Sequence, residues 1–193
     1  LSGATLTSGQ SGYDGSSNAW LLSKDAAASR YVFQYSSLSG VKTFSVYVKA
    51  NTLNNVRLYS TTGTSSTADF SLVDGSLLAS TSIIDSSSED LGNGWWRFSI
   101  TTDGAATLFR IYPDYAGTTA GNILIQNAQL EQGTVATDYI ATTTVAVSEG
   151  PVANMPRLNS VAGGCPALLL ELQWTNIVTN SELFSAGNWW TID

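Results

Sequence analysis

The feature that most constrains the fold is an alternation of apolar and polar residues with a period of two, which recurs along most of the chain. Two runs, KTFSVYVKA and GWWRFSITT, show it most clearly. The residues of these runs that should face a core are Phe44, Val46, Val48, Trp96, Phe98 and Ile100. This period is typical of half-buried β-strands, and no window of ten or more residues keeps a helical spacing with caps.

Glycine-containing dipeptides separate the alternating runs and predict turns. They are Ser39-Gly40, Asp74-Gly75, Asn93-Gly94, Asp103-Gly104 and Ala116-Gly117. Further short runs are YVFQYS, NVRLYST, DFSLV, SLLASTSII, TLFRIY and NILIQNAQL. Many short strands between turns predict an all-β fold, namely an antiparallel β-sandwich or jelly roll, over residues 13–144.

The alternating pattern ends near residue 144, and the composition changes after it. Residues 145–166 are rich in proline and glycine and read as an extended connector, and ALLLELQWTNIV then follows as a strand or a short helix. We therefore expect residues 1–144 to form the sandwich and residues 167–193 to form an arm that packs on another surface. Cys165 is the only cysteine, so it is expected to be a buried free thiol, with an interchain disulfide as the alternative.

Composition excludes several classes of function. The net charge is −7 and the eight basic residues are scattered, which argues against nucleic acid as a partner. The longest apolar runs are far short of a membrane span. The chain has no histidine, so a Ser-His pair or a His-based metal site cannot form, and its acids stand mostly in turn-like contexts. We therefore expect a protein that is not an enzyme.

Aromatic residues on strands and turns are candidates for a glycan platform, because sugar rings stack on tryptophan and tyrosine. The candidates are Trp95, Tyr47, Tyr59, Tyr112 and Tyr115. The alternative is that these rings belong to the core or to an interface, which is common for aromatics in sandwich strands. Trp95 and the adjacent Trp96 must point to opposite faces of one strand.

Several segments, taken in order, resemble a known module. They are LGNGWWRFSITT, RIYP, GNILIQNAQLEQGTVATDYIATT and PRLNSVAGGCPALLLELQWTNIVTNSELFS. Together they resemble a module common in bacteriophage tail and virion structural proteins, which is similar to jelly-roll carbohydrate-binding and concanavalin A-like lectin domains. The resemblance covers residues from about 13 to 193.

The sequence departs from the pattern of that module at several positions. Gln126 and Asn127 stand where Trp-Gly is usual, Ala141 replaces a proline, and Leu172 and Trp174 replace Pro and Arg. The missing tryptophan removes one ring on which a sugar could stack.

The resemblance also implies a possible structural calcium ion. The turn at Asp14-Gly15, with Asn18, resembles one that lies beside calcium in related sandwiches, and Glu131 or Asp25 could add oxygen ligands. The alternative is an Asx-stabilised turn without metal.

In the module, a segment similar to residues 175–193 opens the sandwich, and a stretch similar to residues 1–22 follows it. The resemblance thus implies that the sandwich of residues 1–144 lacks its first strand and that the chain is one period of a tandem or head-to-tail array. The side chains expected to fill a neighbouring sandwich are Leu183, Phe184, Trp189 and Trp190. A tail that folds back on its own sandwich is the alternative.

Two functions remain as expectations. The first is a structural repeat module of a viral tail or extracellular fibre, which assembles head to tail with copies of itself by donating a strand and forms a filament. The alternative is a carbohydrate-binding adhesin module that recognises cell-surface glycan. Both place the protein outside the cell or on a virion, and a composition of only 12% charged residues fits such β proteins.

Overall fold

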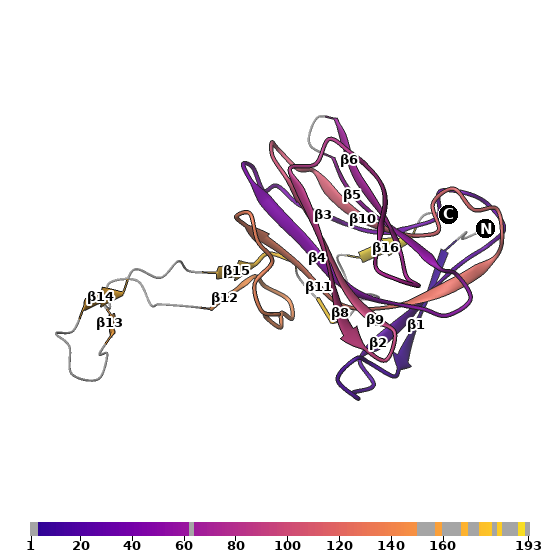
Figure 1. Cartoon of the computed structure of the whole chain (residues 1–193), viewed down its shortest axis with the longest axis horizontal. Coiled ribbons are helices and arrows are strands. Elements are labelled where there is room, and N and C mark those ends of the chain that lie inside the picture. Colours follow the sequence, from indigo (N-terminus) through magenta and orange to yellow (C-terminus); the bar gives the residue numbers. More distant parts are fainter. Residues whose placement is uncertain are drawn as a thin grey trace.

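The structure is a computed structural model that describes residues 4–61, 64–149, 157–159, 167–169, 174–178, 181–182 and 189–191. Strands, turns and bends make up these residues, and none of them is helical. Two antiparallel sheets stack face to face (Figure 1), so the predicted all-β sandwich is confirmed. Within the described ranges no helix is long and apolar enough to cross a membrane.

The first sheet has six strands in the order β1-β2-β11-β4-β9-β8. In that order they are β1 (Ala4–Gln10), β2 (Ala19–Lys24), β11 (Gly121–Gln132), β4 (Lys42–Ala50), β9 (Trp95–Thr102) and β8 (Asp85–Gly92). The register of β11 against β4 shifts between Gln126 and Gln129. Asn127 has a φ of 52° at this bulge, in the left-handed region that asparagine tolerates better than most residues.

The second sheet also has six strands, in the order β16-β3-β10-β5-β6-β7. In that order they are β16 (Trp189–Thr191), β3 (Val32–Tyr35), β10 (Leu108–Pro113), β5 (Asn55–Thr61), β6 (Ser65–Ser71) and β7 (Leu77–Thr81). Strand β16 comes from the C-terminal part of the chain and pairs with β3, with Trp190 opposite Phe33. The C-terminal segment thus completes one edge of the sheet in its own chain.

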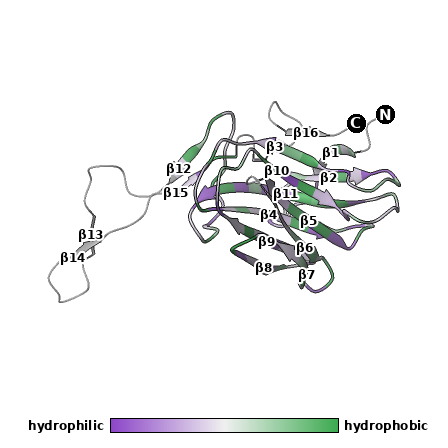
Figure 2. Cartoon of the chain, turned by 90° about the horizontal axis from the view of Figure 1, so that it is seen from above, coloured by the Kyte–Doolittle hydropathy of each residue, from purple (hydrophilic) through white to green (hydrophobic). Residues whose placement is uncertain are grey.

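The core lies between the two sheets and is filled by the inward positions of the alternating strands (Figure 2). Phe70 of β6 stacks on Phe98 of β9 with ring centroids 4.5 Å apart, and Phe44 of β4 meets Phe109 of β10 at 5.1 Å. The predicted core positions that are fully buried are Phe44, Val46, Val48, Phe98 and Ile100. Trp96 is partly buried and packs against this core.

Trp96 also explains a glycine in one of the predicted turns. Gly75 has a φ of 72°, and a Cβ atom added there would lie 2.3 Å from the Trp96 ring. A side chain at position 75 would therefore meet both backbone strain and a clash. The neighbouring hairpin between β8 and β9 turns through Asn93 and Gly94, whose φ values of 54° and 78° match a type I′ turn.

Exposed strands lie at one edge of each sheet. Strand β8 has the sequence DSSSEDLG and is largely exposed, and all five residues of β7 at the edge of the other sheet are exposed. The sequence analysis did not predict β8. An edge strand that buries little apolar surface on either face does not need alternating apolar and polar residues. Strand β8 is therefore recognised only by its pairing with β9.

The C-terminal region forms two small ladders and several contacts with the sandwich. Strand β12 (Val147–Glu149) pairs with β15 (Trp174–Asn176), and β13 (Arg157–Asn159) pairs with β14 (Ala167–Leu169). The β13-β14 ladder is drawn apart from the strands of the sandwich in Figure 1. The predicted connector over residues 145–166 thus contributes two short strands to these ladders.

Candidate functional site

The most distinctive surface is the outer face of the second sheet. Two strands carry the pattern Arg-x-Tyr, RLY in β5 and RIY in β10. Their antiparallel register sets Arg110 opposite Tyr59 and Tyr112 opposite Arg57. Since side chains alternate along a strand, all four residues share the face opposite the core. The aromatic face, as we call it, comprises Tyr31, Phe33, Tyr35, Arg57, Tyr59, Arg110, Tyr112 and Tyr115.

The rings of this face contact one another around Tyr112. The ring centroid of Tyr112 lies 4.6 Å from that of Tyr31, 5.2 Å from that of Tyr115 and 6.1 Å from that of Tyr59. Tyr112 is therefore only 3% exposed, whereas Tyr35 at the β3 side is 66% exposed. Tyr112 and Tyr31 are therefore buried within this face, while Phe33, Tyr59 and Tyr115 are partly exposed around them.

Arg57 is neutralised by an acid on the neighbouring strand. Its Nε and Nη2 atoms donate to the two carboxylate oxygens of Asp69 at 2.5 and 2.6 Å. This hydrogen-bonded pair raises the pKa of Arg57. The guanidinium carbon also lies 3.6 Å from the centroid of the Tyr115 ring, so Arg57 holds that ring in place.

Arg110 has no such acid. Its guanidinium carbon lies 4.4 Å from the centroid of the Tyr31 ring and 4.6 Å from that of Tyr59. Its Nη1 donates to the Tyr112 hydroxyl at 2.8 Å, while its buried Nε has no hydrogen-bond partner among the described residues. The Arg110 guanidinium is thus held by aromatic rings, and no carboxylate in the described part of the chain forms an ion pair with it.

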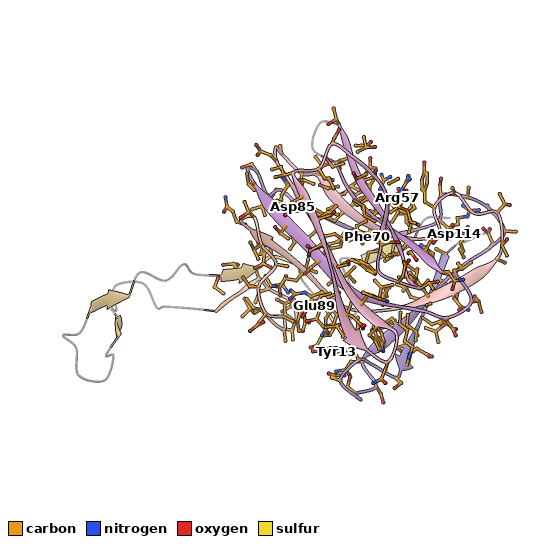
Figure 3. The ribbon with its side chains drawn as sticks, viewed as in Figure 1. Tyr13, Arg57, Phe70, Asp85, Glu89 and Asp114 are labelled. Atoms are coloured by element: carbon orange, nitrogen blue, oxygen red, sulfur yellow. The ribbon has the colours of Figure 1, made fainter. Side chains whose placement is uncertain are left out.

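A small cavity of about 110 Å³ adjoins the aromatic face near Tyr115. Asp69 and Asp114 contribute carboxylates to its wall, and Asn55 contributes an amide. Figure 3 shows Arg57 and Asp114 at the same end of the sandwich. The cavity therefore brings hydrogen-bond acceptors next to the rings.

Of the predicted platform, Tyr59, Tyr112 and Tyr115 share one face, but Tyr112 is buried there and only Tyr59 and Tyr115 are partly exposed. The prediction that Tyr47 and Trp95 are exposed platform residues is wrong, because they are only 6% and 2% exposed. Both lie on the outer face of the first sheet, in a cluster that Tyr13 and Tyr139 cover. The Tyr47 centroid lies 4.6 Å from that of Tyr13 and 6.3 Å from that of Tyr139.

Residues 134–142 cover that part of the first sheet by polar contacts. The buried Glu131 carboxylate accepts hydrogen bonds from the Thr137 main-chain N–H at 2.9 Å and from the Thr137 hydroxyl at 2.6 Å. Arg97 donates to the carbonyl oxygen of Thr137, and the Ile140 N–H donates to Gln129 at 2.8 Å. These bonds hold a loop over Tyr47 and Trp95 that strand periodicity could not reveal.

A second cavity, of about 140 Å³, lies beside this loop and β8. Serine and threonine hydroxyls line it together with Asp85, Glu89 and Arg97. Figure 3 marks Asp85 and Glu89 on that side of the molecule. No tryptophan, tyrosine or phenylalanine of the described chain lines it, so it lacks the stacking surface that the aromatic face offers.

Sequence reasoning missed Tyr31, Phe33, Tyr35, Arg57 and Arg110. The signal for the first three was present in YVFQY, where the aromatic residues alternate and so share one face. The two Arg-x-Tyr stretches were a signal for the arginines. Recognising it required the pairing of β5 with β10, which lie far apart in the sequence.

Asp14 and Asn18, the candidates for calcium, lie in a turn closed by hydrogen bonds. Asp14 Oδ1 accepts from the Ser16 N–H at 3.0 Å, and the Asn18 N–H donates to the Ser16 hydroxyl at 3.3 Å. The hydrogen bond from the Ser16 side chain is the main cause that lowers the pKa of Asp14. No group of three or more His, Cys, Asp and Glu residues that could hold a metal occurs in the described ranges. Calcium at this turn stays a prediction.

The predicted assembly arm is described only in part. Leu183, Phe184 and Cys165 lie outside the described residues. Trp189 and Trp190 belong to β16, which pairs with β3 of the same chain. The Ile177 N–H donates to the Leu130 carbonyl at 2.7 Å, and the Trp20 Nε1–H donates to the Glu182 carbonyl at 2.8 Å. The single chain thus docks this segment on its own sandwich, and donation to a neighbour stays a prediction.

The buried tyrosines predict a loss of stability in alkali. Burial raises the pKa of Tyr47 and of Tyr112 to about 12. An unfolded chain ionises its tyrosines near pH 10. The contribution of these two phenols to the free energy of unfolding is therefore fully present below pH 10. It is lost as the pH rises through their folded pKa. The free energy of unfolding should fall by at most about 1.4 kcal/mol per pH unit for each ring, less where solvent reaches it.

Urea denaturation at pH 9 and at pH 11.5 measures this fall. Tyr47→Phe should reduce the fall, because phenylalanine does not ionise. An unfolding free energy that is equal at the two pH values would contradict the burial of these phenols.

No protein-family model matches the chain, and no curated protein is significantly similar to it.

Proposed function

We propose that this domain binds carbohydrate on the aromatic face, as a module of an extracellular or virion protein. The observation that carries the proposal is the antiparallel pairing of the two Arg-x-Tyr stretches, which gathers rings and guanidinium groups on one side of one sheet. Sugars stack their apolar ring faces on aromatic side chains and exchange hydrogen bonds with fixed polar groups. The face and its adjoining cavity offer both.

The polar groups around the rings match the hydroxyls of a sugar. Asp69 and Asp114 are acceptors in the adjoining cavity, and Arg110 and the tyrosine hydroxyls are donors. Tyr59 already shares a hydrogen bond with the Ser65 hydroxyl at 2.9 Å, so its ring orientation is fixed before a ligand arrives. A preorganised surface loses less freedom on binding.

Replacing exposed rings of the face should weaken glycan binding. We expect Tyr35→Ala and Tyr59→Ala each to lower the affinity for a bound glycan by about tenfold, which corresponds to about 1.4 kcal/mol. A glycan array identifies the ligand, and calorimetric titration measures the affinity. Val135→Ala is the control, because Val135 is exposed but lies beside the first sheet. Absence of any bound glycan, or equal binding by all the variants, would refute the proposal.

A second proposal is that the protein is a structural module of a fibre that assembles head to tail. One observation favours it: the described residues 174–178, 181–182 and 189–191 contact the sandwich, although they lie far from its other strands in the sequence. Asn176 and Val178 are buried in the sandwich and β16 adds to the β3 edge. The same contacts can form with the segment of another copy, as in domain swapping. Repetition of such an exchange in one direction gives an open filament.

Assembly should depend on protein concentration if neighbours exchange this segment. We expect analytical ultracentrifugation to show a growing series of oligomers with rising concentration, and electron microscopy to show filaments. Removal of residues 174–193 should abolish the series. A full-length chain that stays monomeric at every concentration would show that the segment serves only its own sandwich.

A further inference from the structure

We infer that the sugar bound on the aromatic face is an acidic one, and that Arg110 binds its carboxylate. This inference rests on the proposed carbohydrate-binding function and names the class of ligand. A uronic acid and a sialic acid both present such a carboxylate on a pyranose ring.

The two arginines of the face are in different electrostatic states. Arg57 forms a two-bond pair with Asp69, so its charge is balanced within the protein. Arg110 lies opposite Tyr59, two residues along the sheet from Arg57, and its guanidinium contacts the tyrosines Tyr31, Tyr59 and Tyr112. The ion pair between Arg57 and Asp69 has no net charge. The positive charge of the aromatic face therefore comes from Arg110.

Arg110 differs from the other basic residues in what surrounds it. The chain has eight basic residues against fifteen acidic ones, and among the described residues only Arg30 and Arg57 form ion pairs. Lys42 is buried and donates to the carbonyl oxygens of Gly40 and Gly104 at 2.9 and 2.5 Å, and Arg30 pairs with Asp25 at 3.0 Å. Those cations therefore have identifiable structural partners. Arg110 stands instead among the rings that would hold a ligand.

The guanidinium of Arg110 is also fixed in orientation. The Tyr31 and Tyr59 rings flank it at 4.4 and 4.6 Å, and its Nη1 is tied to the Tyr112 hydroxyl. A guanidinium has five N–H donors in a planar fork, and only one of them is engaged with a described residue here. Two parallel N–H donors of such a fork match the two oxygens of a carboxylate.

The surrounding rings select a sugar over a free anion. The guanidinium of Arg110 lies against the Tyr31 and Tyr59 rings, so the atoms attached to a carboxylate bound there would lie beside aromatic rings. The flat ring of a pyranose satisfies this requirement by stacking. An acidic peptide would satisfy the charge but would not need the rings, so it is an alternative that the test must separate.

The experiment compares acidic and neutral partners of otherwise similar shape. Titrations with trigalacturonate and its methyl ester form one pair, and sialyllactose and lactose form the other. We expect wild-type protein to bind the acidic member of at least one pair at least tenfold more tightly. The pair that shows the preference identifies a uronic or a sialic carboxylate. The preference should weaken as the salt concentration rises.

Variants assign the preference to Arg110. Arg110→Gln should reduce the difference between acidic and neutral ligand to less than about threefold while neutral binding remains, and Arg110→Lys should leave an intermediate preference, because lysine keeps the charge but not the fork. Lys49→Gln removes a positive charge from β4 of the first sheet and should change nothing.

The outcomes separate this inference from the proposed function. Equal binding of acidic and neutral sugars by the wild type, or a preference that Arg110→Gln retains, would overturn the inference and leave carbohydrate binding intact. Failure to bind any of the four sugars, together with binding of a glutamate-rich peptide, would overturn both. The wild-type comparison decides the matter even if a variant does not fold.

Discussion

Phe98→Ala should lower the free energy of unfolding by about 3–5 kcal/mol, the range for removing a phenylalanine from a packed core. Phe98 is fully buried, stacks on Phe70 of the opposite sheet at 4.5 Å and lies 6.2 Å from the Trp96 ring. The alanine would leave a cavity where the two sheets meet. Because a domain of this kind has only about 5–15 kcal/mol of stability, the loss should be visible as a large fall in the urea midpoint.

Tyr35→Ala is the matched control for that substitution. It also removes an aromatic ring, but Tyr35 is 66% exposed, so the midpoint should hardly move. A change below about 1 kcal/mol for Phe98→Ala would mean that the sheets do not pack on each other at this point.

Asn176→Ala should lower the free energy of unfolding by about 2–4 kcal/mol, because it leaves buried main-chain groups without partners. Asn176 is fully buried. Its Oδ1 accepts from the Leu130 and Val178 N–H groups at 3.2 and 3.1 Å, and its Nδ2 donates to the Ile140 carbonyl at 2.7 Å. This one side chain joins β11, the loop of residues 134–142 and the C-terminal segment.

Thr175→Ala is the control for Asn176→Ala. Among the described residues, the Thr175 hydroxyl forms a hydrogen bond with the exposed Ser148 hydroxyl at 2.6 Å. Its removal should therefore change the free energy of unfolding little. Urea denaturation measures both variants, and hydrogen exchange at the Leu130 amide reports the bond directly. If Asn176→Ala leaves stability and exchange unchanged, the segment does not dock on the sandwich as described. If stability rises with protein concentration, a neighbouring copy supplies it.

Local sequence predicted the strands that cover the core. Phe44, Val46 and Val48 alternate within one stretch, and burial on one face is what alternation reports. Strand β8 escaped because its residues are exposed at an edge, where no pattern is required. The six-strand order of each sheet was not predictable in the same way, since it depends on pairings between distant segments.

The candidate site shows the same division. Trp95 and Tyr47 point outward from their strands, as the alternation predicted, but a loop that follows β11 covers them. Tyr59 remains partly exposed because its strand lies in the other sheet, whereas Tyr112 on the neighbouring strand is buried by the tyrosines around it. Whether an outward residue is exposed therefore depends on which sheet contains its strand and on what crosses that sheet, and neither is written in the local sequence.

The polar edge strand β8 has a consequence for how copies of this protein can meet. An unpaired edge is a template on which another strand can grow, and uncontrolled growth of this kind leads to aggregation. Strand β8 presents Asp85, Glu89 and Asp90 along its edge, so two copies that approach edge to edge would bring like charges together. Stacking of copies through the β8 edge into amyloid-like ribbons is thereby opposed, and exchange of segments between copies is directed to the side of the second sheet that β16 forms.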